Sequence, residues 1–301
     1  MPAQGRPLIC LKDIFWALYL WPGRWAASLL PLNWMRRSSV WLLPASRILS
    51  RLMRRRWLQE LANYPALMPK DRNSQQLFQS HIANAVARAI DDLLMEGHPA
   101  EDLVLHQEIK GVEHLETALA AGHGVLLSSG HFFASRLAKQ IMASRGWPVT
   151  SVRDLAFDDP ALGRWGKRYL QLRYYRFLHG IIREEVDSND PECTLKILAR
   201  LRAGGIVDIH IDAPFRHNTH PLQFLGASQY FPKGFLEIAH RTGTPVVPWL
   251  CLGNSRELLL KFHPPLFPNA GSPVELLEQL IRLLERQVIQ HPEQWEYTVR
   301  F

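Results

Sequence analysis

The sequence predicts an α/β fold in which a largely parallel central sheet carries helices on both faces, preceded by amphipathic, membrane-associating helices. Two observations predict it. After Pro99, short apolar runs alternate with longer amphipathic segments, which is typical of parallel strands joined by helical crossovers. Before that point the composition differs, because tryptophan and basic residues are concentrated in residues 1–60. We therefore expect a membrane-associating helical region over residues 1–62 and an α/β domain over residues 63–301.

The overall composition excludes several classes of protein. The chain has 301 residues, of which 47% are hydrophobic and 21% charged. These values exclude a disordered chain or a low-complexity linker and allow a substantial buried core. The three cysteines are far apart and odd in number, so they provide neither a disulfide framework nor a pair at zinc-ligand spacing. A reducing compartment is the expectation.

The N-terminal region combines positive charge with tryptophan. Residues 1–60 carry ten basic and two acidic side chains and six of the ten tryptophans. Amphipathic indoles and cations suit the interface between lipid headgroups and acyl chains. The longest uninterrupted apolar run, Ile14 to Trp21, falls short of the ~20 residues that a membrane span needs. We expect helices on the membrane surface, and no cleavable signal peptide because Lys12 and Asp13 interrupt the apolar region. A nucleic-acid-binding arm is disfavoured, because bulky aliphatic and indole side chains do not suit phosphate contacts.

The elements follow from periodicity. Apolar residues recur at helical spacing over residues 74–96, which predicts a long amphipathic helix. Short apolar runs predict strands over residues 124–129, 149–153, 180–183, 206–211, 246–252 and 258–262. Helices are predicted between them, near residues 133–145, 160–174, 191–203, 233–242 and 273–290.

Polar residues follow several of these strands, and parallel sheets carry their chemistry at the carboxyl ends of the strands. His131 follows the strand at 124–129, Asp154 follows 149–153, and Asp212 follows 206–211. Glu184 and Glu185 follow the strand at 180–183. A histidine with a pKa near ~6.5 can act as a general base at neutral pH. The alternative for each residue alone is capping or solvation, whereas together they indicate a site.

Six segments, in chain order, carry a resemblance to a known family: GHGVLLSSGHF, SVR, HGIIR, GGIVDIHIDAPF, FLGASQYFPKGFLEIAHRTGTPVVPWL and HPEQWEYTVRF. The chain resembles the lipid A biosynthesis acyltransferases, a branch of the lysophospholipid acyltransferase superfamily, over nearly its whole length. The resemblance implies a glycerol-3-phosphate acyltransferase-like fold and an enzyme at the cytoplasmic face of the bacterial inner membrane. His131 would take a proton from a lipid or glycolipid acceptor, which attacks an acyl thioester of acyl carrier protein or coenzyme A. No cofactor is implied.

The chain departs from the family signature, in which four residues separate the histidine from an aspartate or glutamate. Here that position holds Arg136, which cannot stabilise the imidazolium formed during attack. Three explanations stay open. Another carboxylate orients His131, with Asp212 the first choice and Asp154 the second. Alternatively, Arg136 binds a phosphate or carboxylate of the acceptor. In the third, the protein has lost transfer chemistry and kept lipid binding.

The resemblance also implies substrate-binding residues, with surface salt bridges as the alternative for the arginines. Gly234 would open a helix whose amides receive an anion, and Lys233 would replace the hydroxyl donors often found there. No metal is expected, because the histidines at 210, 217 and 220 fit no zinc signature. The substrate-binding set is Arg136, Arg153, Arg183, Phe224, Gly226, Lys233 and Gly234.

Overall fold

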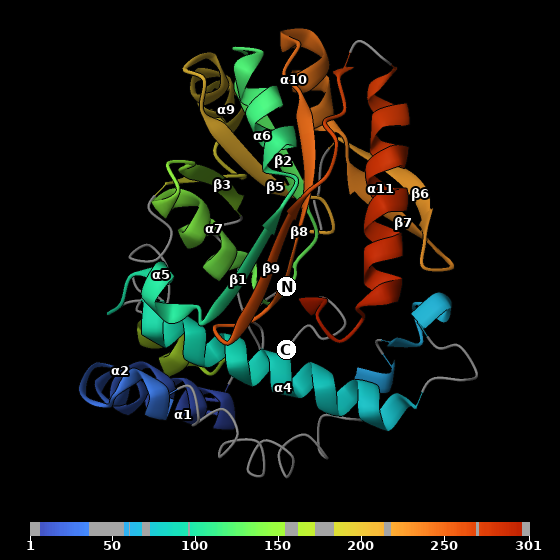
Figure 1. Cartoon of the computed structure of the whole chain (residues 1–301). Coiled ribbons are helices and arrows are strands. Elements are labelled where there is room, and N and C mark those ends of the chain that lie inside the picture. Colours follow the sequence, from blue (N-terminus) through green and yellow to red (C-terminus); the bar gives the residue numbers. More distant parts are fainter. Residues whose placement is uncertain are drawn as a thin grey trace.

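A seven-stranded sheet forms the centre of the molecule, and helices flank it on both sides (Figure 1). The computed structural model describes residues 7–35, 57–59, 61–67, 73–95, 97–153, 162–171, 184–213, 218–268 and 271–296. The strand order is β1-β9-β8-β2-β5-β3-β4. The strands are β1 (His106–Lys110), β2 (Val125–Ser129), β3 (Val149–Arg153), β4 (Glu185–Asp187), β5 (Ile206–His210), β8 (Val246–Gly253) and β9 (Glu257–Phe262).

Most strand pairs in this sheet are parallel. Strands β8, β2, β5, β3 and β4 run in one direction, β9 is antiparallel to β8, and β1 is parallel to β9. All five residues of β2 are buried, as expected for a central parallel strand covered on both faces. The prediction of a largely parallel α/β sheet is confirmed.

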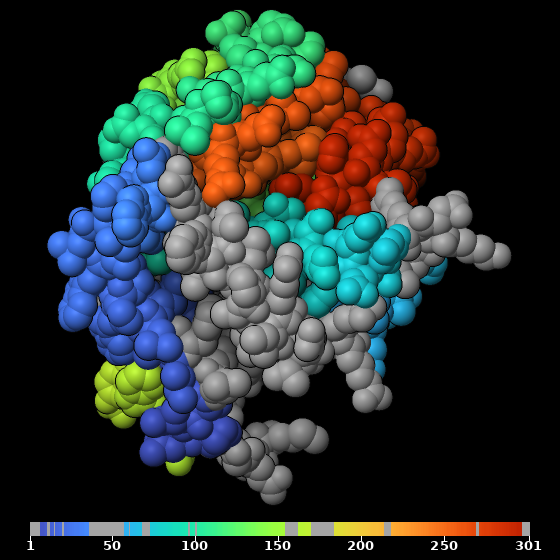
Figure 2. Space-filling view, turned by 60° about the horizontal axis from the view of Figure 1, so that its bottom comes forward, coloured from blue at the N-terminus to red at the C-terminus, as the bar shows by residue number. Residues whose placement is uncertain are grey.

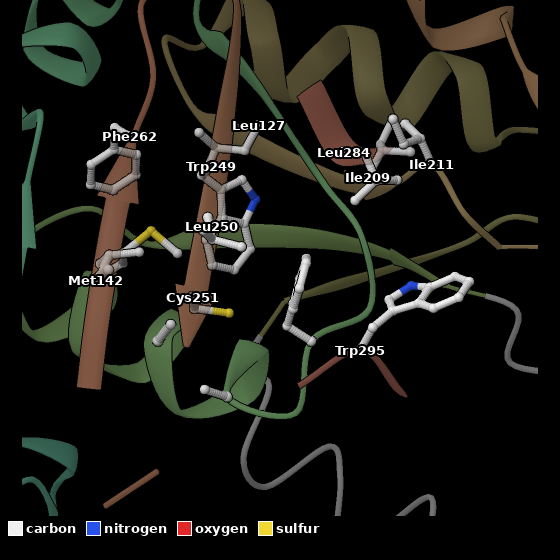
Figure 3. Close-up of a cluster of buried hydrophobic side chains, with 14 of the residues drawn as sticks. Leu127, Met142, Ile209, Ile211, Trp249, Leu250, Cys251, Phe262, Leu284 and Trp295 are labelled. Atoms are coloured by element: carbon white, nitrogen blue, oxygen red, sulfur yellow. The ribbon is translucent and has the colours of Figure 1, made fainter. Parts of the chain in front are cut away.

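The helices lie close to their predicted places. Helix α11 spans Pro273–Gln290, because Ser272 forms a capping box with Glu275 and proline occupies the first turn. The other helices of the domain are η2 (Pro65–Leu67), α4 (Ser74–Met95), α5 (Ala100–Leu103), α6 (Val112–Ala120), α7 (Ser135–Ser144), α9 (Cys193–Arg202) and α10 (Gly234–Thr242). Their apolar faces and the sheet form one core, part of which is shown in Figure 3.

Some elements differ from the sequence-based expectation. The sequence did not predict β1, α6, or the hairpin of β6 (Thr219–Phe224) and β7 (Ala227–Pro232). Leu225 and Gly226 turn this hairpin with φ of 54° and 84°, and a leucine with positive φ is a weak turn signal. The predicted strand at 180–183 lies outside the described residues, and so do the ends of the predicted helix at 160–174. Within 162–171, the π-helix η3 spans Gly166–Gln171.

The N-terminal helices lie beneath the sheet, and α4 runs between them and the sheet (Figure 1). They comprise α1 (Leu11–Leu18), the π-helical turn η1 (Tyr19–Gly23) and α2 (Arg24–Leu29). Pro22 lies inside η1; the wider turn accommodates the ring that would clash in an α-helix. The Tyr19 hydroxyl donates to the carbonyl of Ala89 in α4, at 2.9 Å. No helix in the described part of the chain is long and apolar enough to cross a membrane.

Candidate active site

The pairing register of β2 and β5 brings His131 and Asp212 together. Ser129 pairs with His210 at the carboxyl ends of these adjacent parallel strands. His131 and Asp212 each follow their paired residue by two positions, so both lie just beyond the same edge of the sheet. Gly130 makes the approach possible, since a Cβ there would lie 3.0 Å from Asp212 Oδ2 and 2.6 Å from Leu284.

Asp212 receives three donors. Its Oδ1 lies 2.5 Å from His131 Nδ1, and its Oδ2 accepts from the His131 backbone N–H at 2.8 Å and from Trp295 Nε1–H at 2.7 Å. The Asp212 side chain is 2% exposed, whereas that of His131 is 26% exposed. A neutral His131 that donates Nδ1–H to this carboxylate carries its lone pair on Nε2. The site can therefore hold a base with one side toward solvent and the other on a buried anion.

The charge on Asp212 is stabilised despite its burial. Burial alone would raise the pKa of the carboxyl, but the charge of His131 and the hydrogen bonds from His131 and Trp295 lower the pKa below its ordinary value. Asp212 is thus a carboxylate at neutral pH, the form that can orient an imidazole and stabilise its protonated state.

A second buried polar group lies beside His131. The rings of His131 and His210 are 4.4 Å apart between centroids, at 80°. His210 Nε2 is 3.2 Å from Asp208 Oδ2, which is also 2.5 Å from Lys139 Nζ, and Trp249 donates to Oδ1 at 2.8 Å. Burial lowers the pKa of His210 to about 4. A neutral His210 adds no positive charge beside His131.

Arg136 takes part in a chain of ion pairs. It pairs with Asp92 of α4, whose side chain is 2% exposed. Arg88, one turn earlier in α4, lies 3.5 Å from Asp92 and also pairs with Glu296. Burial would raise the pKa of Glu296, but Arg88, Arg136 and His131 lower it below its ordinary value. The arginine in the place of the family acid is therefore bound to a buried carboxylate.

The other predicted site residues have varied surroundings. Arg153 pairs with Glu185, which matches the salt-bridge alternative. Phe224 is 1% exposed and packs on Phe231 and Trp295, with ring centroids 5.4 and 5.9 Å away. Arg183 and Asp154 lie outside the described residues.

Gly226, Lys233 and Gly234 were also predicted to bind substrate. Gly226 forms the β6–β7 turn. Lys233 precedes α10 and pairs with Glu237 at 2.8 Å, and a Cβ on Gly234 would lie 3.0 Å from the side chain of Asn218. Substrate binding by the predicted set stays a prediction.

Sequence reasoning missed several members of the site. Trp295 ends the HPEQW segment at residues 291–295, and nothing in that segment indicates that the indole reaches Asp212. Asp208 and Lys139 interact between β5 and α7, and Asp92 lies on a helix predicted only for its apolar face. Among the described residues no group of three or more His, Cys, Asp or Glu could hold a metal ion.

A small apolar pocket lies against residues on either side of His131, which include Ser129 and Phe132. The pocket lies between the sheet and α11, and its cavity volume is about 20 Å³. Burial lowers the pKa of His263 in its wall to about 4, so this side chain is neutral at pH 7. Its lining includes Ser128, Ser129, Trp249, His263, Leu284 and Gln287.

Comparison with known proteins identifies relatives. Residues 25–300 match the family described as bacterial lipid A biosynthesis acyltransferase. A phosphatidylinositol mannoside acyltransferase of Mycobacterium tuberculosis strain ATCC 25618 / H37Rv is 23% identical over 193 residues, 64% of this chain and 58% of that protein. The same values hold for the protein of that description from strain CDC 1551 / Oshkosh. The chain thus spans less than two thirds of these relatives.

Among solved structures, the 1-acyl-sn-glycerophosphate acyltransferase PlsC of Thermotoga maritima aligns with 93% of this chain and 97% of its own. The TM-score is 0.36 and the sequence identity 13%.

Proposed function

This chain belongs to the bacterial lipid A biosynthesis acyltransferase family, and we propose that it transfers a fatty acyl chain from an acyl thioester to a hydroxyl or amine of a lipid or glycolipid acceptor. The donor is acyl carrier protein or coenzyme A. The observation that carries the proposal is the 2.5 Å contact between His131 Nδ1 and Asp212 Oδ1 at the edge of the sheet. The name of the mycobacterial relatives supports a glycolipid as acceptor.

The proposed mechanism assigns the proton transfers to His131. Its Nε2 removes the proton of the acceptor hydroxyl as the oxygen attacks the thioester carbonyl. Asp212 stabilises the imidazolium that forms and holds the ring in the required tautomer. When the tetrahedral intermediate collapses, the carbon–sulfur bond breaks and the imidazolium protonates the leaving thiolate. The products are an acyl ester and a free thiol.

The position of Asp212 supports catalysis over lipid binding alone. Because Arg136 replaces the family acid, one explanation was that the protein binds lipid but no longer catalyses acyl transfer. A carboxylate from the neighbouring strand nevertheless lies within hydrogen-bond distance of His131, which restores the partner of the base.

We also propose that the N-terminal helices bind the membrane surface. Trp25 and Leu29 of α2 are 67% and 81% exposed, and Trp34, five residues after α2, is 68% exposed. The exposed Arg164 and Arg168 lie in the segment that packs against α1. Exposed indoles beside cations suit anionic lipid, and a basic surface suits an acidic carrier protein. We place this surface on the cytoplasmic face of the bacterial inner membrane, as the family resemblance implies.

The first experiment compares acyl-thioester hydrolysis by the purified protein and its His131→Ala variant in detergent, with water standing in for the acceptor. Loss of a catalytic base reduces turnover by ~10³-fold or more, so we expect a nearly inactive variant. His106→Ala, which changes an exposed histidine of β1, is the matched control and should retain activity. If neither wild type nor variant exceeds the protein-free rate while acyl chains still bind, the lipid-binding alternative replaces this proposal.

A further inference from the structure

The C-terminal segment of the described chain runs beside His131. Phe133 N–H donates to the carbonyl of Gln294 at 3.1 Å, and Glu296 N–H donates to the carbonyl of His131 at 2.7 Å. Between them, Phe132 and Trp295 form an antiparallel bridge. This segment therefore fixes the backbone on which His131 is carried.

The same segment places a hydrogen-bond donor on Asp212. Trp295 is 1% exposed, and its indole lies at the edge of the buried cluster that includes Ile211 (Figure 3). An indole N–H can only donate and is normally paired when buried. Here it donates to Asp212 Oδ2 at 2.7 Å, while His131 occupies Oδ1. Each carboxylate oxygen thereby contacts a side-chain nitrogen, and Oδ2 also accepts from the His131 backbone N–H.

Ion pairs between side chains hold the C-terminal segment in turn. Glu296, next to Trp295, pairs with Arg88; Arg88 lies 3.5 Å from Asp92, and Asp92 pairs with Arg136. Asp92 is 2% exposed, and a buried carboxylate depends on such cations. The chain of ion pairs from Arg136 to Glu296 joins α7, α4 and the C-terminal segment.

We propose that Trp295 is a positioning residue for Asp212, and that the ion-pair chain Arg136–Asp92–Arg88–Glu296 holds the segment that carries its indole. Asp212 follows the neighbouring strand β5, and a donor from the C-terminal segment fixes its orientation. Arg136 then serves the base indirectly, without contacting the acceptor. The consequence for turnover rests on the proposed function.

Removal of the indole N–H has a defined effect on pH dependence. A hydrogen bond to a carboxylate favours the ionised form, so its loss makes the His131–Asp212 pair take up protons at higher pH. Since the base must be unprotonated, the acid limb of the kcat/KM profile moves to higher pH. Within the described residues, the charged or titratable groups around the pair are His210, with Asp208 and Lys139 beside it, and Glu296. Arg88, Asp92 and Arg136 lie further along the ion-pair chain.

The test is Trp295→Phe, which keeps an aromatic ring and removes the donor. A hydrogen bond to a charged group is worth ~10- to 100-fold, so we expect kcat to fall by that factor with an unchanged KM and a raised acid limb. Trp147→Phe is the matched control, because Trp147 packs on Phe262 at 6.1 Å, away from the site. Wild-type kcat and acid limb in Trp295→Phe would overturn the proposal, provided that His131→Ala is inactive. An active His131→Ala would instead remove the proposed function itself.

A second pair of variants tests the ion-pair chain and does not depend on Trp295→Phe folding. Arg136→Met should lower kcat and raise the acid limb as Trp295→Phe does, by a smaller factor, and Arg136→Lys should restore most of the activity. Melting curves of both variants check that they fold. A raised KM for the acceptor in Arg136→Met, with kcat and the acid limb unchanged, would overturn this assignment in favour of acceptor binding.

Discussion

Asp212 and Asp13 are both buried carboxylates, but the two regions use them for different purposes. At the sheet edge, Asp212 accepts from two side chains, one of them the partly exposed His131. In the N-terminal helices, Asp13 is 0% exposed and accepts from the backbone N–H groups of Gly163 and Cys10 and from the Cys10 thiol. The first carboxylate faces a group that can gain and lose a proton. The second joins two segments 150 residues apart.

The two regions also differ in what they expose. The sheet edge keeps its polar groups within a buried network, whereas α1 and α2 turn large apolar side chains outward. Figure 2 shows the N-terminal helices as a separate part of the surface, with residues of the 162–171 segment beside them. A Cβ on Gly163 or Gly166 would lie 2.5 or 2.0 Å from an Asp13 oxygen. This close packing helps to hold the exposed apolar surface in place, together with the core contacts of Ala27 and Met35.

The largest effect expected from this comparison is that of Asp212→Asn. The amide offers one acceptor where three donors converge, and its NH₂ group faces donors, so His131 loses its orientation and tautomer. We expect turnover of a short-chain acyl-coenzyme A to fall by ~10²- to 10⁴-fold. Asp13→Asn also changes a buried acceptor and is the matched control; it should retain most of this activity. An equal loss in both variants, with equal melting temperatures, would contradict the distinction between the two aspartates.

A smaller effect is expected at Gly166. Gly166→Ala places a methyl group against the Asp13 carboxylate, and overpacking of this kind costs ~1–3 kcal/mol. Urea unfolding should show the loss, and limited proteolysis should cut the N-terminal helices sooner. Gly97→Ala is the control, because nothing lies within 4 Å of a Cβ there.

The cause of that loss can be isolated with a double variant. In an Asp13→Ala background the clash is absent, so the further cost of Gly166→Ala should largely disappear. A cost that stays the same with and without the Asp13 carboxylate would show that Asp13 does not anchor this segment.

The sequence predicted the sheet and the pair at its edge because both follow from short-range patterns. Apolar runs located β2 and β5, and the rule of strand ends placed His131 and Asp212 at one edge. Trp295 and Asp92 were not predicted as members of the site. Their contacts join residues 83 and 44 positions apart in sequence, and they depend on how the C-terminal segment and α4 pack. No periodicity or spacing encodes such a contact.

In the N-terminal region, composition was informative and the packing contacts were not predictable. Its composition predicted a membrane-associating surface, and Trp25 and Trp34 are exposed although Trp57 is buried. The anchor at Asp13 was missed, because the glycines that make room for it lie in the distant 162–171 segment. For Arg136, the sequence reveals one feature and the structure another. Its departure from the family signature is visible in the sequence, but its partner Asp92 is visible only in the structure.

The smallest predicted effect concerns lipid binding by the exposed surface. Trp25→Ser combined with Trp34→Ser should weaken binding to phosphatidylglycerol vesicles by about tenfold, equivalent to ~1.4 kcal/mol, because two indoles no longer insert at the interface. Tyr230→Ser is the matched control: Tyr230 is 67% exposed, like Trp25, but lies in the β6–β7 hairpin. Vesicle sedimentation measures the partition, and hydrolysis of a soluble thioester should be unchanged in all variants. Equal partition of the double variant and wild type would place the membrane contact elsewhere, and the N-terminal helices would then differ from the sheet edge only in packing.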